Sequence, residues 1–448
     1  MEANSTMQQQ VNVYRASLLD FPAPTSNPSS DFRYIQDGLL VTRNSKIVDI
    51  GSYNNLISSY KSHTISDLRG KLIIPGLIDS HLHFPQTEML ASYGEQLLEW
   101  LNNYTFPTEA KFADDDYATK IASIFLHQLV SNGTTTGMVF STVHKSAADA
   151  LFNAASKLNM CLIAGKVCMD RHCPVELQDS PALAQQHSAE LIESWHGKGR
   201  LAYALTPRFA PTSSEQQLAA LGELAKQYPD VYIQTHLSEN LNEIEWVRQL
   251  FPKHRSYLDV YDQYGLVRKG SVFGHCLHLQ DEEWRRLKSA QATIAFCPSS
   301  NLFLGSGLFE LEKARQHGIN VSLASDVGAG TSFNMLRTMG DAYKVCQLKH
   351  NPLCPLEGLY MMTQGAACNL GLEHTIGNLN TGTDADFVVL DPAFNELSAL
   401  RTQHLIEERT ISAPQDVLFA LSMLADERTI FQTYIAGNCV HQVNKELN

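Results

Sequence analysis

Paired cysteines, long apolar runs and basic clusters are absent from this sequence, and each absence excludes a class of protein. The nine cysteines are scattered singly with no Cys-x-x-Cys pair, which indicates reduced thiols rather than a disulfide framework. No stretch reaches the roughly 18 apolar residues of a membrane-spanning helix, and no basic segment precedes an apolar one near the N-terminus. We therefore expect a cytoplasmic protein with no membrane partner.

Positive charge is also scarce. The net charge is -13, and no run of Lys and Arg could follow a phosphate backbone, so we expect no nucleic-acid polymer as partner. A small neutral or cationic substrate fits this charge better. The 448 residues, 44% of them hydrophobic, suit one large domain with an appendage or two to three ordinary domains.

The middle of the chain alternates apolar strand-like runs with helical stretches, which is typical of a parallel sheet built from βα units. The eight runs are Leu72–Asp79, Thr134–Phe140, Cys161–Cys168, Leu201–Leu205, Val231–Thr235, Ser271–Phe273, Thr293–Phe296 and Val321–Ala324. Eight such units predict an α/β fold, a (β/α)₈ TIM barrel, over residues 71–380.

Both ends of the chain carry shorter strand-like pieces. Examples are Gly38–Val41, Lys46–Ile50 and Phe387–Leu390. Neither end has enough apolar surface to close a core alone, so we expect residues 1–70 and 381–448 to form one small composite β-sandwich domain.

One helix of the predicted barrel is marked at both ends. After Asp114–Asp116, apolar residues keep helical spacing, and Asn132-Gly133 ends the pattern. These apolar residues are Tyr117, Ile121, Ile124, Phe125 and Leu129.

Polar side chains follow the predicted strands, where a TIM barrel has its active site. They are Asp79-Ser-His81-Leu-His83, Lys166, Thr206-Pro-Arg208-Phe209, His236-Leu-Ser-Glu239, His275-Cys276, Cys297-Pro-Ser-Ser-Asn301 and Ser325-Asp326. His81 and His83 are two residues apart, so on a strand they share one face and can reach one metal ion.

Four of these residues form a candidate metal site. His81, His83, His236 and Asp326 offer three imidazoles and one carboxylate, which suit a borderline divalent ion such as zinc. A water bound there would have its pKa lowered towards about 7 and would be the nucleophile. Any one histidine could instead make a core hydrogen bond. Four such residues at strand ends favour the metal site.

Glu239 lies three residues beyond His236. A carboxylate beside the metal-bound water can take its proton and pass it to a substrate. Acidic residues also favour the first turn of a helix, and Asn240, Asn242 and Glu243 follow. Both interpretations can hold together.

Longer motifs resemble a known family. Pro75-Gly-Leu-Ile-Asp79-Ser-His81-Leu-His83, His236-Leu-Ser-Glu239, Gly274-His275 and Ser325-Asp326 resemble the metal-site motifs of the amidohydrolase superfamily, and Gly382-Thr-Asp-Ala-Asp386 resembles part of its composite sandwich. More narrowly, the chain resembles the guanine deaminase family. The motifs for this are His83-Phe-Pro-Gln86, Leu98-Glu-Trp100-Leu, Tyr104-Thr-Phe-Pro107, Gly165–Asp170, Thr206–Thr212 and Cys297–Asn301.

The resemblance implies hydrolysis of guanine to xanthine and ammonia by attack of a zinc-bound hydroxide on C2. It implies one zinc ion per subunit, with iron as the alternative metal. Glu239 would carry a proton to ring nitrogen N3, Asp326 would help protonate the leaving amine, and His275 would hydrogen-bond the nucleophile or the ring. Closed twofold symmetry is the commonest assembly, so we expect a homodimer.

Other side chains are candidates for reading the purine. Gln86 and Arg208 can hydrogen-bond its N1/O6 edge, and Phe209 and Trp100 offer faces for stacking. Taken alone, the two aromatic residues are more often packing residues, and Arg208 could be a structural ion-pair partner.

Two segments call for separate interpretation. Some relatives bridge two metals with a carboxylated lysine, but Gly165-Lys166-Val resembles the mononuclear branch, so we expect Lys166 to have a structural or supporting role. Arg171-His172-Cys173-Pro174 stands where related deaminases usually carry an Asn-rich turn. One His and one Cys without matching partners favour an ordinary loop there.

Other functions stay open. Another aminohydrolase or chlorohydrolase of the superfamily, acting on a triazine or an adenosine-like compound, would share the metal site and differ in the pocket. A barrel that had lost catalysis should lack a ligand or Glu239, and this sequence retains all five. Zinc deaminases of the cytidine type are excluded, because His-x-Glu with Pro-Cys-x-x-Cys is absent.

Overall fold

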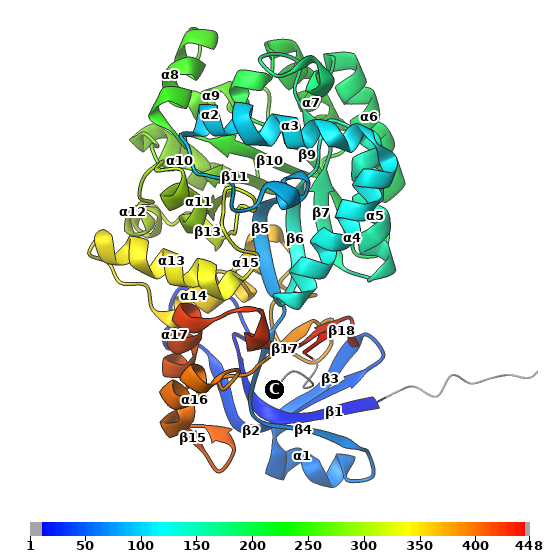
Figure 1. Cartoon of the computed structure of the whole chain (residues 1–448), viewed down its shortest axis with the longest axis vertical. Coiled ribbons are helices and arrows are strands. Elements are labelled where there is room, and N and C mark those ends of the chain that lie inside the picture. The colour runs from blue at the N-terminus through cyan, green and yellow to red at the C-terminus, as the bar shows by residue number, and fades with distance from the viewer. Residues whose placement is uncertain (1–10, 444–448) are drawn as a thin grey trace, which may run out of the picture.

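The structure is a computed structural model that describes residues 11–443, and two sheets organise it (Figure 1). Eight parallel strands form the larger sheet, with the short strand β8 (Val167–Cys168) attached to β9. The eight are β5 (Leu77–His83), β6 (Thr134–Phe140), β7 (Cys161–Gly165), β9 (Leu201–Pro207), β10 (Tyr232–Leu237), β11 (Ser271–His275), β12 (Thr293–Phe296) and β13 (Asn320–Leu323). The predicted TIM barrel is confirmed.

Hydrogen bonds between β5 and the end of β13 bring the first and last strands together. The Ser80 hydroxyl donates to the Leu323 carbonyl at 3.0 Å. Just beyond β13, the amide of Asp326 donates to the carbonyl of His81 at 2.9 Å, and the amide of His83 donates to Val327 at 2.6 Å. These bonds close the barrel at the end where the candidate metal ligands lie.

A second, seven-stranded sheet combines both ends of the described chain, as expected. Its order is β18 (Asn438–Gln442), β17 (Ile430–Ile435), β14 (Phe387–Leu390), β4 (Ile65–Pro75), β1 (Val11–Asp20), β2 (Arg33–Arg43) and β3 (Lys46–Ser52). The N-terminal and C-terminal parts meet where β14 pairs antiparallel with β4, with Phe387 opposite Pro75. Phe387 stacks on Tyr434 with ring centroids 4.2 Å apart, inside this sheet's core.

The prediction of one barrel strand over Leu72–Asp79 was wrong. Its first half belongs to β4 in the terminal sheet, and β5 begins only at Leu77. Gly76 joins the two strands where a side chain has no room, since an added Cβ would lie 2.1 Å from Thr135 Oγ1. Hydrophobicity alone could not separate the strands, because both sheets bury this segment. His81 and His83 consequently lie within β5 rather than after it.

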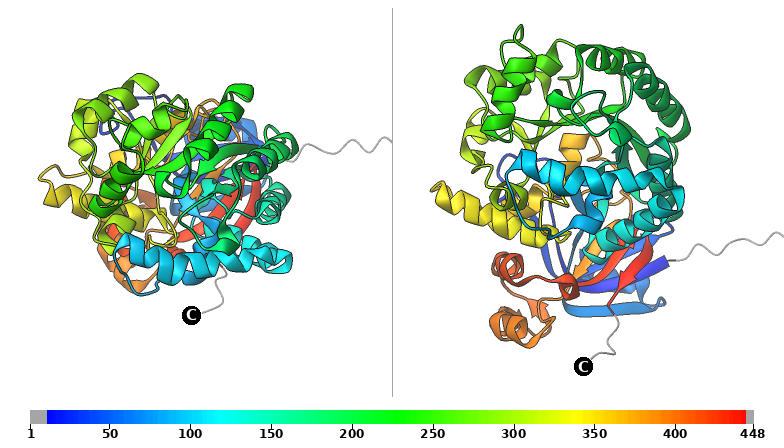
Figure 2. Two further views of the ribbon diagram at one scale, coloured as in Figure 1. Left: turned by 90° about the horizontal axis from the view of Figure 1, so that it is seen from above. Right: turned by 45° about the horizontal axis from the view of Figure 1, so that its top comes forward.

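Helices surround the barrel, as the view from above in Figure 2 shows. The longer ones are α4 (Asp115–Ser131), α5 (Lys145–Lys157), α6 (Pro181–Trp195), α7 (Glu215–Gln227), α8 (Leu241–Leu250), α10 (Asp281–Ala290) and α13 (Met335–Leu348). The shorter ones include α9 (Tyr257–Asp262), α11 (Pro298–Phe303), α12 (Leu311–Gln316), α14 (Pro355–Tyr360) and α15 (Gln364–Leu370). Beside the terminal sheet lie α1 (Tyr53–Tyr60), α16 (Glu396–Thr402) and α17 (Pro414–Leu424).

Helix α4 matches the predicted helix at both ends. Asp114 caps it by accepting the amides of Asp116 and Tyr117, and Asn132 ends it. Ile121, Phe125 and Leu129 are buried on its inner face. Ile124 is 40% exposed, so the apolar spacing extends onto the outer face of the helix.

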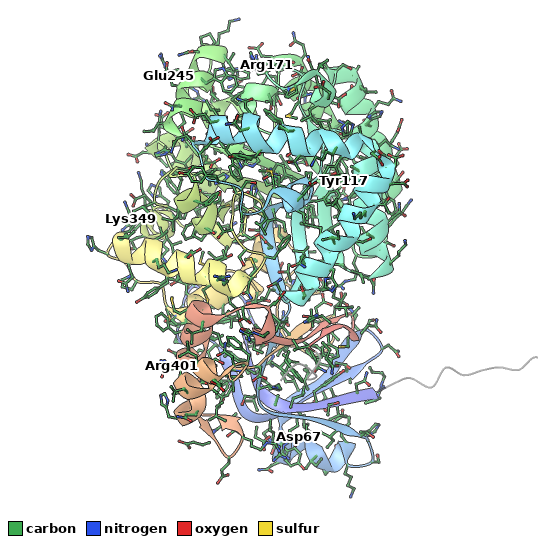
Figure 3. All side chains as sticks on the ribbon, in the orientation of Figure 1. Asp67, Tyr117, Arg171, Glu245, Lys349 and Arg401 are labelled. Atoms are coloured by element: carbon green, nitrogen blue, oxygen red, sulfur yellow. The ribbon has the colours of Figure 1, made fainter. Side chains whose placement is uncertain are left out.

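The connection from β5 to α4 crosses the mouth of the barrel (Figure 1). It contains the 3₁₀ helix η1 (Phe84–Met89), α2 (Leu97–Trp100), the π-helical turn η2 (Leu101–Thr105) and α3 (Phe106–Ala110). Charged side chains such as Glu245, Lys349 and Arg401 lie at the outside of the molecule (Figure 3). Among residues 11–443, no helix combines the length and apolarity needed to cross a membrane.

A buried ion pair joins the barrel to the terminal sheet. Arg200, just before β9, donates to both carboxylate oxygens of Asp386, just before β14. The Asp386 side chain is only 2% exposed and also accepts the amide of Ala436 at 2.7 Å. Removing Asp386 would therefore leave both a largely buried guanidinium and a buried amide without this acceptor.

Asp386→Ala is expected to lower the free energy of unfolding by about 1 to 3 kcal/mol, because the buried Ala436 amide loses its acceptor while Arg200 keeps its ion pair with Asp384. Urea or thermal unfolding measures the change. The matched control is Glu223→Ala, whose partner Lys226 is 71% exposed, and it should change stability by no more than about 0.5 kcal/mol. Equal effects of the two variants would contradict this role for the buried pair.

Candidate metal centre and its cavity

The predicted metal ligands converge at the C-terminal ends of the barrel strands. His81 and His83 come from the end of β5, His236 from β10, and Asp326 from the segment after β13. Each offers one ligand atom, and these four atoms all lie within 4.8 Å of one another. Asp326 Oδ1 is 3.4 Å from His81 Nε2 and 3.2 Å from His83 Nε2.

The imidazoles present free nitrogen atoms to the centre of this cluster. His236 Nδ1 lies 2.6 Å from the carbonyl oxygen of Arg208, so Nδ1 carries the hydrogen and Nε2 keeps its lone pair. That Nε2 lies 3.1 Å from His83 Nε2, while both ring nitrogens of His81 are buried without a hydrogen-bond partner. Facing nitrogens of this kind fit a shared cation better than they fit each other.

The electrostatics agree with a metal site. Burial lowers the pKa of His83 to about 3, and burial with the neighbouring imidazoles holds the pKa of His236 well below its usual range. Both rings are therefore neutral, the form that binds metal. Burial alone would raise the pKa of Asp326, but contacts with His81 and His83 outweigh it and hold that pKa well below its usual range. The donors fit a divalent cation.

Asp79 holds the turn that carries Asp326. Its carboxylate accepts the amide of Ser325 at 3.0 Å and the Ser325 hydroxyl at 2.5 Å. Asp326 itself has a positive φ of 52°. Burial raises the pKa of Asp79 to about 6. This side chain therefore fixes the backbone next to a candidate ligand rather than joining the ligand set.

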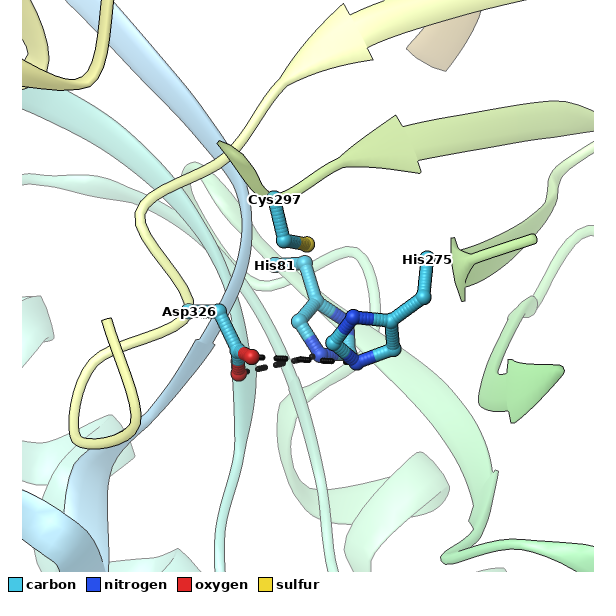
Figure 4. Close-up of side chains that lie close together, drawn as sticks. All are labelled: His81, His275, Cys297 and Asp326. Carbon is cyan, nitrogen blue, oxygen red and sulfur yellow. Dashed lines mark ion pairs between the residues drawn. The ribbon is translucent and has the colours of Figure 1, made fainter. Parts of the chain in front are cut away.

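A second donor set shares His81 and Asp326 and adds His275 and Cys297 (Figure 4). The Cys297 thiol donates to the Ala295 carbonyl at 3.4 Å, and burial raises its pKa well above the usual range. Cys297 is thus a neutral thiol engaged with backbone. The set with three imidazoles and a carboxylate suits a borderline divalent ion better.

Glu239 and His275 lie beside the cluster. Glu239 Oε2 is 3.4 Å from His275 Nε2, and that nitrogen is 3.7 Å from Asp326 Oδ2. The Ser306 hydroxyl donates to Glu239 Oε1 at 3.0 Å, and His275 Nδ1 lies 2.8 Å from Asn301 Oδ1. Burial, reinforced by the negative charge of Asp326, raises the pKa of Glu239 to about 8. A carboxyl group with this pKa can both take and give a proton near neutral pH.

The helix-capping role considered for Glu239 is filled by Glu243 instead. Asn240 is the N-cap of α8, and Glu243 completes the capping box by accepting the amides of Asn240 and Glu239 at 3.1 and 2.9 Å. Glu239 precedes the helix and lines the cavity. Glu243 therefore fixes the backbone from which Glu239 projects.

One cavity brings the predicted ligands, acid–base groups and substrate contacts together. Its lining includes His83, Gln86, Trp100, Arg208, Phe209, His236, Glu239, His275 and Asp326. Arg208 and Gln86 are 2% and 3% exposed, so any bond they make to a ligand would be shielded from water. Apolar contacts come from Leu97, Leu101, Leu304 and Ala329.

Three polar residues were missed as site residues by the sequence interpretation. Glu109 binds Arg208, Ser306 binds Glu239, and Asn301 binds His275. Asn301 ends the Cys297–Asn301 motif, from which no role for it was predicted. Glu109 and Ser306 follow no predicted strand, so nothing in the pattern placed them at the barrel mouth.

Lys166 and the Arg171–Pro174 segment lie outside both candidate donor sets found among residues 11–443. Lys166 is 1% exposed and pairs with Asp179, and its ammonium also donates to the Val167 carbonyl at 3.2 Å. The His172 ring packs edge-on against Trp246, and the Cys173 thiol lies 3.7 Å from the Leu177 carbonyl. These contacts support the structural role expected for Lys166 and the ordinary loop expected after it.

Comparison with known proteins agrees with this geometry. The model of the Amidohydrolase family matches residues 72–440. Guanine deaminase of Escherichia coli (strain K12) is 48% identical over 434 residues, which cover 96% of this chain and 98% of that protein. The structure titled E. coli Guanine Deaminase matches with a TM-score of 0.93 and covers 97% of this chain and 100% of the other.

A guanine deaminase structure from C. acetobutylicum, described with bound guanine in the active site, is 32% identical with a TM-score of 0.87. It covers 96% of this chain, and all of its own chain is matched. The similarity thus spans both the barrel and the terminal sheet. The chain belongs to the amidohydrolase family.

Proposed function

We propose that the protein is a guanine deaminase, which hydrolyses guanine to xanthine and ammonia. One observation carries the proposal: a single cavity is lined by three of the four clustered donors (His83, His236 and Asp326), the acid–base candidate Glu239 and the hydrogen-bonding residues Gln86 and Arg208. A guanine deaminase is 48% identical over 96% of this chain, and this high identity supports guanine over a triazine or an adenosine-like compound.

His81, His83, His236 and Asp326 would hold one divalent ion per subunit, and we infer that it is zinc, with iron as the alternative. When bound, such an ion lowers the pKa of a water and so supplies a nucleophile at neutral pH. The chain's own contribution is to keep His83 and His236 neutral and to orient the imidazoles. The hydrogen bond from His236 Nδ1 to the Arg208 carbonyl does this for one ring.

Glu239 is the proposed proton carrier. Water adds its oxygen to C2 of the purine, Glu239 accepts one water proton, and the same carboxyl group delivers that proton to ring nitrogen N3. The second water proton passes to the leaving amine with the help of Asp326. The bond from C2 to the amine nitrogen then breaks and releases ammonia. His275, 3.4 Å from Glu239, is placed to hydrogen-bond the nucleophile or the ring.

We propose that Gln86 and Arg208 form hydrogen bonds with the N1/O6 edge of guanine. They and the aromatic side chains of Phe209 and Trp100 line the same cavity. Trp100 is 1% exposed and packs on Tyr104 at 5.0 Å, so it is a rigid wall of the cavity. A homodimeric assembly and a cytoplasmic location stay predictions from the sequence.

The substrate is tested by ammonia release. Metal-replete protein is incubated separately with guanine, adenine, cytosine and melamine, and we expect ammonia from guanine alone at a rate well above the uncatalysed reaction. Guanine carries the 2-amino group and the 6-carbonyl group that this cavity is proposed to read. Turnover of adenine or melamine without turnover of guanine would refute the proposal.

Glu239→Gln is expected to lower kcat for guanine by about 10² to 10⁴-fold, because an amide cannot carry the proton. Steady-state kinetics at saturating guanine measure this. Glu245→Gln is the matched control: Glu245 lies on the outside of α8, with its side chain 49% exposed, and its substitution should leave kcat unchanged. Full activity of Glu239→Gln would contradict the assignment.

Ser306→Ala is expected to change the pH dependence of the reaction. The Ser306 hydrogen bond counteracts part of the rise in the pKa of Glu239, so its loss raises that pKa further. Glu239 must be deprotonated to accept a proton, so activity on the acidic side should be lost at higher pH than in the wild type. The shift in the kcat/KM profile should be about one pH unit, the size of one charge-assisted hydrogen bond.

The control for this shift is Ser289→Ala on the exposed side of α10, where the hydroxyl donates only to the Arg286 carbonyl. Its profile should match the wild type. A Ser306→Ala profile that moves to lower pH, or does not move, would show that Ser306 does not act on Glu239.

A further inference from the structure

Glu109 is a buried carboxylate at the cavity that the proposed mechanism does not use. It lies on α3, and its side chain is fully buried. Both of its oxygens accept from Nη1 of Arg208, at 2.9 and 2.8 Å. The carboxylate therefore fixes the guanidinium that is proposed to read the purine, and it balances that buried charge.

The same carboxylate also holds the amide of Gln86. Gln86 Nε2 donates to Glu109 Oε1 at 3.3 Å, and the backbone amide of Gly328 donates to Gln86 Oε1 at 3.3 Å. The two bonds specify the same orientation of the amide. If it were reversed, its oxygen would face the carboxylate of Glu109 and its nitrogen would face the N–H group of Gly328.

The fixed orientation of the Gln86 amide determines which groups this edge of the cavity can bind. Arg208 has only donors, and Gln86 keeps a second N–H group beside the one bonded to Glu109, so both residues can donate to a ligand. A ring carbonyl can accept from them. An amine at the same ring position would place its own N–H groups against donors, and buried donors without acceptors are costly.

We propose that Glu109 is a positioning residue that makes the enzyme select 6-oxo purines over 6-amino purines. This inference rests on the proposed function, because it concerns the ring edge next to the reacting 2-amino group. Glu109 acts through Arg208 and Gln86 and need not touch the purine. A mere counter-ion of Arg208 would affect activity and stability without changing this preference.

The test compares guanine with 2,6-diaminopurine, which carry the same 2-amino group and differ at position 6. The measured quantity is the ratio of kcat/KM for guanine to kcat/KM for 2,6-diaminopurine. Glu109→Gln is expected to lower this ratio at least tenfold, because a neutral amide no longer fixes Gln86 in one orientation. Both substrates are assayed on one preparation, so any inactive fraction cancels.

Inhibition gives an independent measure of the same preference. Hypoxanthine and adenine both lack the 2-amino group and differ at position 6. We expect the ratio of their inhibition constants to move in the same direction in Glu109→Gln. This comparison requires only turnover of guanine.

Two variants serve as controls. Glu109→Asp keeps the charge but shortens the side chain, so it should lower the ratio less than Glu109→Gln does. Glu88→Gln removes a carboxylate on η1 that is 46% exposed and pairs with Lys111, and its ratio should equal that of the wild type. If Glu109→Gln does not fold, Gln86→Met provides the test, because it removes the amide and leaves the buried ion pair intact. It too should lower the ratio at least tenfold.

The outcomes separate the two proposals. Wild-type protein that releases no ammonia from guanine would refute the proposed function, and this inference with it. Wild-type activity with an unchanged ratio in Glu109→Gln, or in Gln86→Met where the first variant does not fold, would refute the inference alone. An equal loss on both substrates would show that Glu109 is only a counter-ion.

Discussion

Closure of the barrel between its first and last strands is the constraint on which the site depends. The amide of Asp326 donates to the His81 carbonyl at 2.9 Å, and the amide of His83 donates to the Val327 carbonyl at 2.6 Å. These two bonds join the strands and also place the Asp326 carboxylate between the two imidazoles. The same contacts therefore complete the fold and assemble most of the candidate metal site, so neither can form far in advance of the other.

Burial gives this arrangement its electrostatic character. Asp326 and Glu239 place two buried carboxyl groups in one cavity, and burial keeps the neighbouring His83 and His236 neutral. The neighbouring carboxylate of Asp326 adds to the rise in the pKa of Glu239. A divalent cation between the imidazoles and Asp326 would offset that repulsion and bring Glu239 closer to an ordinary carboxyl group. The net charge at the donor set therefore affects the pKa of the acid–base group Glu239.

The sequence predicted the features that depend on periodic hydrophobicity and on position at strand ends. It located seven barrel strands and all four converging donors, because a parallel barrel gathers the ends of its strands. It failed at Leu72–Asp79, where two sheets bury one continuous apolar run. Glu109 was missed because α3 crosses the barrel mouth within a long connection. No repeating pattern specifies where such a connection lies.

Arg208 and Gln86 link the metal cluster to the substrate edge of the cavity. The carbonyl of Arg208 orients His236, while its side chain lines the cavity. Gln86 lies three residues after His83, and the Gly328 amide that binds it lies two residues after Asp326. A shift of any of these three loops would move a donor of the metal cluster and a group facing the substrate together. Selection of the purine and orientation of the metal ligands therefore depend on the same backbone segments.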